Sequence, residues 1–177
     1  MPDVRVVGGL VLVLLAGCGG SKSPVERVLL REGRVDPGVG VSSLKLGMSV
    51  QTVEKTFGKP SLRVVTPGGN TAMDLVYGDV GVRVIVRSDN GRVVRIVCGV
   101  PDTSEGMSFE GSTAQDVKVG SSAQTVARAY GPAPAQTATT LDYPELGIQF
   151  IMEEGRVVKM SVMAAKPAAS QPQATAP

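Results

Sequence analysis

Two segments of the chain share one pattern: LKLGMSVQTVEKTFGKP at residues 44–60 and VKVGSSAQTVARAYGP at residues 117–132. In each segment a serine, Ser49 or Ser122, stands where its hydroxyl can accept hydrogen bonds from the first turn of a helix. Each segment ends in a glycine followed closely by proline, which is typical of a helix C-terminus. The pattern therefore predicts the same short helix at two places in the chain.

The similarity continues beyond the helices, in the same order along the chain. Residues 75–77 align with 141–143, residues 81–86 with 147–152, and residues 91–96 with 155–160. The alternation of Val82, Val84 and Val86 with Arg83 and Ile85 predicts a half-buried strand. The triplets Asp89-Asn90-Gly91 and Glu153-Glu154-Gly155 are typical of hairpin turns. We expect an α+β fold of two tandem repeats, each a short helical segment followed by a three- to four-stranded antiparallel sheet.

The composition outside the repeats divides the rest of the chain. The predicted parts are a leader at 1–17, a tether at 18–40, repeat unit 1 at 41–100, a linker at 101–116, repeat unit 2 at 117–164 and a tail at 165–177. The tether and the tail are rich in Gly, Pro, Ser or Ala, a composition unsuited to a packed core, although residues 25–31 have a brief helical pattern. Whether the two units form one continuous sheet is left open by the pattern.

The leader has the form of a secretory signal. Residues 6–15 are apolar or Gly, a stretch too short to span a bilayer, and they are followed by Ala16-Gly17-Cys18. The tetrapeptide 15–18, LAGC, resembles the lipobox of bacterial lipoprotein precursors, which implies cleavage before Cys18 and lipid on its sulfur. The alternative is an ordinary signal peptide that contains a Cys. With the lipid anchor, the expected location is the cell envelope, on the periplasmic face of the outer membrane in a cell with two membranes.

The composition argues against several classes of function. The full chain of 177 residues has no His, two Cys and a formal net charge of +2. Without His, the commonest general base and metal ligand are missing, and the low charge gives no footprint for nucleic acid. We therefore expect a non-enzyme with no cofactor and no metal. Cys98 aligns with Val162 of the second unit, so we interpret it as a small core residue and not as a reactive thiol.

The outward face of the predicted sheet is the candidate site. In the first unit it would carry Arg83, Ile85, Arg87, Val93, Arg95 and Val97. In the second unit the equivalents are Gln149, Ile151, Glu153, Val157, Lys159 and Ser161. Arginine interleaved with aliphatic side chains suits a protein-binding surface. The alternative is a face where β-branched residues serve only strand propensity, or one that the other unit or the linker covers.

The sequence pattern also resembles a family. The segment Leu46-Gly47-Met48-Ser49, then Phe57-Gly58-Lys59-Pro60, a strand with a Tyr and a Gly-centred hairpin resemble the small lipoproteins of the SmpA/OmlA (BamE) type. Two such units in tandem are similar to the β-lactamase inhibitor protein fold. The resemblance implies an envelope lipoprotein that binds or scaffolds another protein, in outer-membrane assembly or maintenance. The alternatives are an inhibitor of a periplasmic hydrolase and a carrier of a small envelope ligand.

Overall fold

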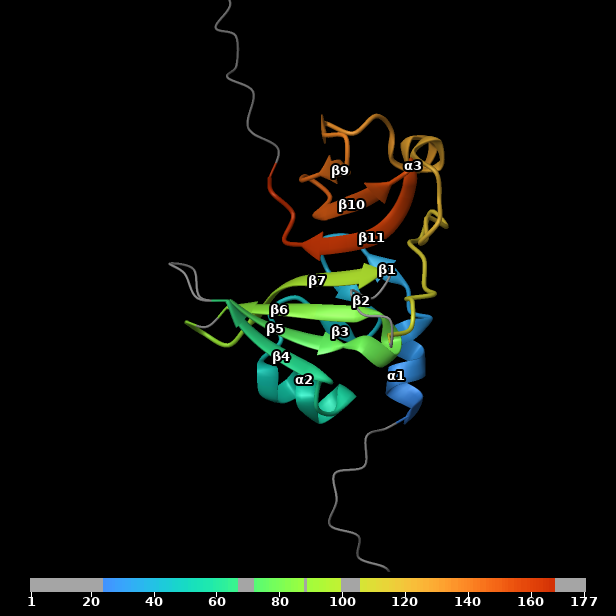
Figure 1. Ribbon diagram of the computed structural model, residues 1–177. Coiled ribbons are helices and arrows are strands. Elements are labelled where there is room, and N and C mark those ends of the chain that lie inside the picture. The colour runs from blue at the N-terminus through green and yellow to red at the C-terminus, as the bar shows by residue number, and fades with distance from the viewer. Residues whose placement is uncertain (1–23, 67–71, 88, 100–105, 168–177) are drawn as a thin grey trace, which may run out of the picture.

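The computed structural model describes residues 24–66, 72–87, 89–99 and 106–167 and has an α+β fold (Figure 1). The helices among these residues are α1 (Pro24–Arg31), α2 (Val50–Phe57), α3 (Ala123–Tyr130) and the 3-10 turn η1 (Gly78–Val80). A small sheet consists of β1 (Val35–Asp36), β2 (Gly40–Val41) and β3 (Leu44–Lys45). The large sheet consists of β4 (Leu62–Thr66), β5 (Ala72–Tyr77), β6 (Val82–Arg87), β7 (Val93–Gly99), β8 (Ala135–Gln136), β9 (Thr140–Tyr143), β10 (Ile148–Glu153) and β11 (Arg156–Met163).

The large sheet is continuous, which answers the question that the sequence left open. Its eight antiparallel strands lie in the order β4-β5-β6-β7-β11-β10-β9-β8, so each half of the chain supplies four neighbouring strands. The halves join where β7 pairs with β11, with Ile96 opposite Val162, Val97 opposite Ser161 and Cys98 opposite Met160. We call this β7–β11 pairing the seam.

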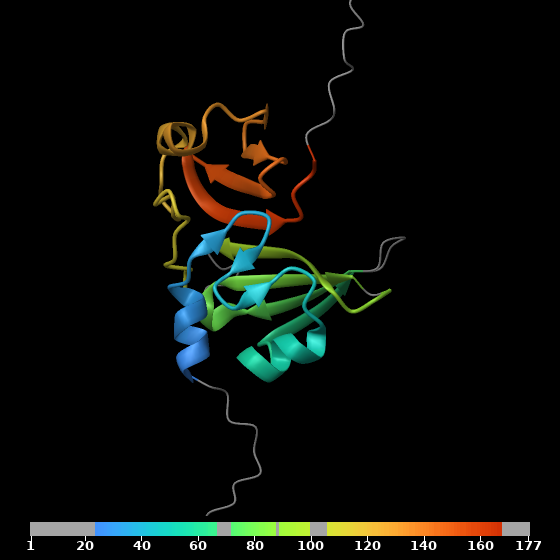
Figure 2. The same ribbon diagram turned by 180° about the vertical axis from the view of Figure 1, so that it is seen from behind.

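One face of the large sheet carries the core. Side chains that alternate along the strands, such as Val82, Val84 and Ile96, are buried against α2, α3 and the small sheet. Figure 2 shows the small sheet lying in front of the large one, close to the seam. Val41 and Leu44 from the small sheet are fully buried in this core. We call this side of the large sheet the core face and the opposite side the outer face.

The two predicted helices begin and end as the sequence indicates. The Oγ atoms of Ser49 and Ser122 accept hydrogen bonds from the backbone N–H groups of Thr52 and Thr125, at 3.2 and 3.1 Å. The helices end at Gly58 and Gly131, whose φ angles of 77° and 80° favour glycine.

Each helix end is tied to the large sheet by a tyrosine. The Tyr77 hydroxyl donates to the Gly58 carbonyl at 3.0 Å, and the Tyr143 hydroxyl donates to the Gly131 carbonyl at 2.8 Å. Because each bond joins residues from a strand and a helix end, it fixes the distance between the two layers of the fold.

The predicted tether is wrong for residues 24–40, which belong to the folded body. Leu30 and Val35 are almost fully buried, and the Arg31 carbonyl accepts hydrogen bonds from the N–H groups of Glu110 and Gly111. The Gly and Pro residues that indicated a spacer instead form the turn between β1 and β2, where Gly38 has a φ of 72°. The composition was misleading because tight turns and flexible linkers use the same residues.

The described part of the predicted linker, residues 106–116, connects β7 to the second half and packs against the body of the fold. Phe109 is only 2% exposed, and its N–H donates to the Gly99 carbonyl at 3.1 Å. Val35 bridges to Thr113 in this segment, so the segment packs against the first strands of the chain.

Several predictions fall on residues outside the described ranges. These are the leader at 1–17, Cys18 with its lipid, residues 101–105 of the linker and residues 168–177 of the tail. Across the described parts of the chain, no helix is both long enough and apolar enough to cross a membrane.

Candidate interaction surface

The outer face carries one unbroken row of paired residues from edge to edge. The registers of neighbouring strands join the following residues into the row: Leu62, Val76, Arg83, Val97, Ser161, Gln149, Asp142 and Ala135. These residues alternate along their strands with core residues, so they lie on the outer face. Figure 1 looks onto this side of the sheet, and no described helix or strand lies across it.

Five of the six residues predicted for the first half lie on this face. Arg83, Ile85, Arg95 and Val97 occupy adjacent positions of β6 and β7, because Arg83 pairs with Val97 and Ile85 pairs with Arg95. Arg87 ends β6, with its side chain exposed and bound to Asp89. The structure therefore brings the predicted cations and aliphatic residues together.

The sixth residue, Val93, was predicted wrongly because a β-bulge interrupts the alternation. Beyond the Ile85–Arg95 pair the register shifts, so that Val86 pairs with Val93 and Val94 is the extra residue. Val93 therefore points into the core and is only 2% exposed.

The second half has the same irregularity at the aligned place. Ile151 pairs with Lys159, but Met152 pairs with Val157, which is only 1% exposed. Val157 therefore joins Val93 in the core, whereas Gln149, Ile151 and Lys159 lie on the outer face as predicted.

Ser161 lies at the centre of the outer face and is nevertheless buried. Its exposure is 1%, and its hydroxyl has no hydrogen-bond partner among the described residues. On β11 it is flanked by two long side chains, because Lys159 and Met163 are its neighbours on the same face of the strand. The surface at the seam is therefore formed by long side chains over a small central residue.

Cations surround the seam. Arg95 is exposed and its guanidinium contacts the Met163 sulfur at 3.9 Å, while Lys159 lies diagonally across the seam from it. Arg83 lies 3.8 Å from the Asp74 carboxylate. The centre of the outer face thus combines three cationic side chains with the aliphatic Ile85 and Val97.

The sequence prediction missed the contribution of the edge strand β4. Leu62 and Val64 lie on the outer face with exposed fractions of 53% and 41%, next to Val76 and Asp74. The run Leu62–Thr66 has strand-forming residues directly after the helix, and this signal was sufficient to include it. The apolar part of the outer face therefore extends to the edge of the sheet.

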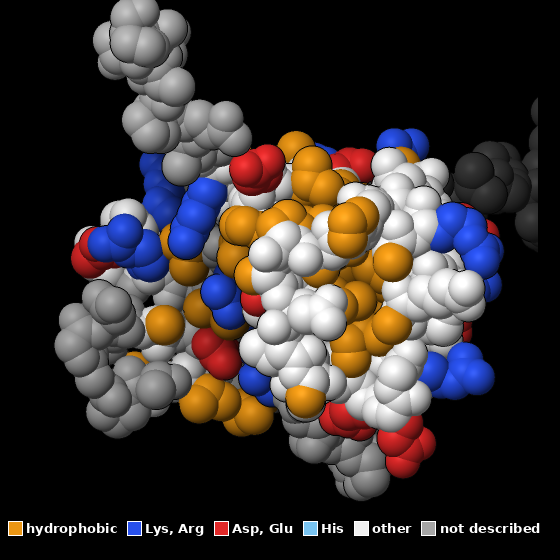
Figure 3. All heavy atoms as spheres, turned by 90° about the horizontal axis from the view of Figure 1, so that it is seen from above, with side chains coloured by type: hydrophobic (Ala, Val, Ile, Leu, Met, Phe, Trp, Pro, Cys, Tyr) orange, Lys and Arg blue, Asp and Glu red, His pale blue; other side chains and the backbone are white. Residues whose placement is uncertain are grey.

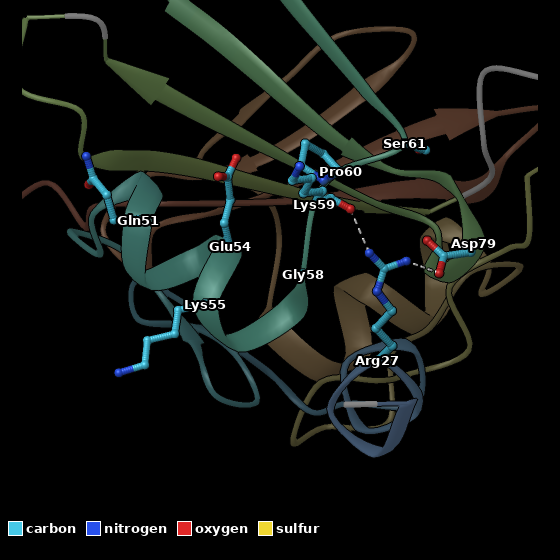
Figure 4. A pocket seen from close by; sticks show the side chains of 9 residues that line it. All are labelled: Arg27, Gln51, Glu54, Lys55, Gly58, Lys59, Pro60, Ser61 and Asp79. Atoms are coloured by element: carbon cyan, nitrogen blue, oxygen red, sulfur yellow. Dashed lines mark hydrogen bonds and ion pairs between the residues drawn. The ribbon is translucent and has the colours of Figure 1, made fainter. Parts of the chain in front are cut away.

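A separate cleft lies between α1 and the end of α2. Figure 4 shows Arg27 from α1 reaching toward Lys59 and Asp79, while Lys55 points away. The Arg27 guanidinium donates to the carbonyls of Phe57 and Lys59, each at 2.8 Å, and bonds to the Asp79 carboxylate.

Arg27 also lies over the Tyr77 ring, at 5.3 Å from the ring centroid. Burial, reinforced by the carboxylate of Glu54, raises the pKa of Tyr77 to about 12. Arg27 therefore holds α1 to the body through Asp79, Tyr77 and the end of α2, and this indicates a structural role for Arg27.

The cysteine and the possible metal ligands of the described residues can also be placed. Cys98 is fully buried, and this burial raises the pKa of its thiol above the ordinary value. Within the described ranges no three His, Cys, Asp or Glu side chains are grouped as metal ligands. The placement of Cys98 in the core agrees with the interpretation from sequence.

The end of the molecule seen in Figure 3 has fewer charged side chains at its centre than the outer face has around the seam. The side chains in the middle of this view are hydrophobic or uncharged, and the charged ones gather at the rim. This end comprises α3 and β9, and residues 129–141 contain no charged residue. On the outer face itself, the second half carries Gln149 and Asp142 at aligned positions of the row, and its Lys159 lies on the seam strand β11.

No family model and no curated protein matches this chain. A solved structure with a partial likeness is that of an extracellular protein containing a SCP domain from Bacillus anthracis str. Ames, at 12% identity and a TM-score of 0.42. The aligned region covers 67% of this chain and 44% of that protein, so this chain spans less than half of its length. A likeness of this size carries no argument about function.

Proposed function

We propose that this protein is a non-enzymatic lipoprotein of the bacterial cell envelope that binds another protein through the outer face of its large sheet. One observation carries the proposal: the core face is covered by α2, α3 and the small sheet, whereas no described element lies across the outer face (Figures 1 and 2). A face with exposed aliphatic side chains next to arginines is typical of protein interfaces.

The residues on this face indicate what kind of partner fits. Ile85, Val97 and Leu62 offer apolar contact, and Arg83 and Arg95 offer charge and planar hydrogen-bond donors. The complementary surface has exposed apolar side chains with carboxylates near them. We expect such a surface on a protein partner in the envelope, with a role in outer-membrane assembly or maintenance in a cell with two membranes.

The proposal includes a duplicated architecture. Two hydrogen bonds at aligned residues of the two halves support it. Arg92 donates to the Gly47 carbonyl and Arg156 donates to the Gly120 carbonyl, each at 3.0 Å. The seam has local two-fold symmetry, because Ile96 pairs with Val162 while the aligned residues Met160 and Cys98 also pair. Two copies of one unit, of the kind in SmpA/OmlA-type lipoproteins, explain both observations.

The membrane anchor rests on the sequence alone. The segment 15–18, LAGC, follows an apolar stretch, and lipid on Cys18 would place the folded body at a membrane surface. The intact mass of the mature chain, purified from cells in detergent, tests this part directly: a mass that fits cleavage before Cys18 plus acyl chains is expected. An unmodified Cys18 would contradict it.

The binding surface is tested by charge reversal. The double variant Arg83→Glu/Arg95→Glu, used as bait in solubilised envelope, should lose the partner that the unaltered chain captures. The matched control is Arg34→Glu/Arg128→Glu, which makes the same charge change at exposed residues outside the outer face. A photo-crosslinker at position 85 should yield a crosslink to the same partner. An identical set of captured proteins for the two double variants would overturn the assignment of the outer face.

A further inference from the structure

Helix α1 has its apolar and charged sides reversed relative to an ordinary surface helix. Val25, Val28 and Leu29 face outward and are 61%, 51% and 54% exposed. The opposite side of the helix carries Arg27 and Arg31, whose side chains are 12% and 26% exposed, together with the buried Leu30. A surface helix normally buries its apolar stripe and exposes its charges.

The contacts of the inward side fix this orientation. Arg27 is held by the carbonyls of Phe57 and Lys59 and by Asp79, and Arg31 forms an ion pair with Glu110. A rotation of α1 that buried Val28 and Leu29 would break these bonds. The outward stripe is therefore a stable property of the fold, and an exposed group of this kind at residues three and four apart marks an interaction site.

The position of α1 in the chain identifies what covers the stripe. Only residues 19–23 separate Cys18 from Pro24. A fully extended chain of that length reaches about 20 Å, so α1 lies within that distance of whatever holds the Cys18 sulfur.

We infer that α1 docks on the membrane, with Val25, Val28 and Leu29 inserted at the level of the lipid headgroups. This inference rests on the lipid anchor at Cys18 in the proposed function and adds a second, non-covalent contact with the same bilayer. Helices that lie in the membrane interface insert an apolar side in this way. Glu32, directly after the helix, is exposed on the same side and marks the end of the stripe.

Docking through α1 has a consequence for the outer face. The contacts of α1 are with η1, with α2 and with the segment that contains Glu110 and Gly111, and none of these lies across the outer face in Figure 1. A body held at two points, the lipid and the stripe, has a defined orientation. That orientation leaves the cationic surface around the seam accessible to a partner.

The absence of tryptophan from the chain gives a direct test. Leu29→Trp places a single tryptophan in the stripe. Leu146→Trp is the matched control, because Leu146 is 43% exposed in the turn between β9 and β10, two strands that lie at the opposite end of the molecule from α1 in Figure 1. Both full-length variants are processed in cells, checked by intact mass and reconstituted into phosphatidylethanolamine/phosphatidylglycerol vesicles with and without brominated lipid. Circular dichroism verifies that each variant is folded.

The expected result is a blue shift and strong quenching by brominated lipid for Leu29→Trp, with neither change for Leu146→Trp. Lipid on Cys18 with equal, unquenched emission from both variants would overturn the docking of α1 and leave the anchor standing. An unlipidated Cys18 would overturn the anchor, and the quenching of Leu29→Trp then decides the docking separately. A blue shift of Leu29→Trp that grows with protein concentration in the absence of vesicles would show that a second copy covers the stripe, and would also overturn the docking.

Discussion

The two halves of the large sheet are built with the same contacts but present different surfaces. In each half a serine caps a helix, a glycine with positive φ ends it, and a tyrosine hydroxyl binds that glycine's carbonyl. The bulges in β6–β7 and β10–β11 lie at aligned positions. These shared contacts hold one helix on the large sheet in each half.

The differences lie on the outer face and around the helix ends. The first half carries Arg83 and Arg95 where the second carries Gln149 and Lys159, and its edge strand has five residues against two. The first half also holds α1 through Arg27, whereas the second has a cluster of Tyr130, Tyr143 and Phe150 with ring centroids 5.4 to 6.0 Å apart. What the halves share stabilises the fold, and what they do not share is where function has to be sought.

Substitution of the aromatic residue at the end of each helix should give the largest effect and an unequal one. Phe57 is fully buried, so Phe57→Ala should lower the free energy of unfolding by about 3–5 kcal/mol. Tyr130 at the aligned position is partly exposed, so Tyr130→Ala should lower the free energy of unfolding by less than Phe57→Ala does. Urea unfolding followed by circular dichroism measures both. Equal losses would mean that the two helices are packed alike and would remove this difference between the halves.

The attachment of α1 is a contact of the first half alone. Arg27→Met removes two hydrogen bonds to carbonyls, the ion pair with Asp79 and the contact with the Tyr77 ring. We expect the free energy of unfolding to fall by about 2–3 kcal/mol, because hydrogen bonds from a charged donor are among the stronger ones and the Arg27 side chain is only 12% exposed. Arg34→Met is the control, since the Arg34 side chain is 67% exposed in its ion pair with Asp36 and should contribute little. Thermal unfolding that fails to separate the two variants would contradict the role of Arg27.

Tyr77 and Tyr143 make equivalent hydrogen bonds in the two halves, and the contribution of Tyr77 to stability should depend on pH. Tyr77→Phe and Tyr143→Phe should each cost about 1–2 kcal/mol at neutral pH, because each leaves a glycine carbonyl without its donor. The pKa of Tyr77 is about 12 in the folded protein against an ordinary value of 10, so folding favours the protonated hydroxyl. Its contribution is therefore complete below pH 10 and is lost as the pH rises to 12. The difference in stability between the unaltered protein and Tyr77→Phe should shrink over that range. A difference that stays constant would show that the hydroxyl does not titrate as described.

The helix caps should give equal effects in the two halves. Ser49→Ala and Ser122→Ala each remove one side-chain acceptor from a first-turn N–H group, at 3.2 and 3.1 Å. Each should cost about 1 kcal/mol. Urea unfolding of both variants and of the double variant checks this, and the losses should add because the caps lie in different helices. If one of the two substitutions left the free energy of unfolding unchanged, the two caps would not be equivalent.

The smallest effect is expected at the seam. Ser161→Val replaces a buried hydroxyl without a partner by the residue that the first half has at position 97. The stability should change by no more than about 1 kcal/mol and should not fall, because no hydrogen bond is lost and β-branched residues suit strands. A clear loss of stability would show that the hydroxyl has a partner in solution.

The helices, their caps and most strands follow from the sequence because they depend on neighbouring residues. Ser49 with Gly58 and the alternation from Val82 to Val86 are patterns of this kind. Val93 was misplaced since a single extra residue, Val94, reverses the alternation, and nothing in the local pattern announces the bulge. The Gly and Pro content of residues 24–40 predicts a tether where the chain is folded, because tight turns and linkers use the same residues.

The local structure of each half and most of the residues on the outer face were thus determined by short-range pattern, the exceptions being Val93, Val157 and the residues of β4. The tertiary structure decided how the halves join, which way α1 faces and which side of the large sheet stays uncovered. The seam pairs residues some 64 positions apart, such as Val97 with Ser161, and Arg27 reaches a carbonyl 30 residues away. Such contacts depend on where the whole chain places its strands and helix ends, so no periodicity within a segment contains them.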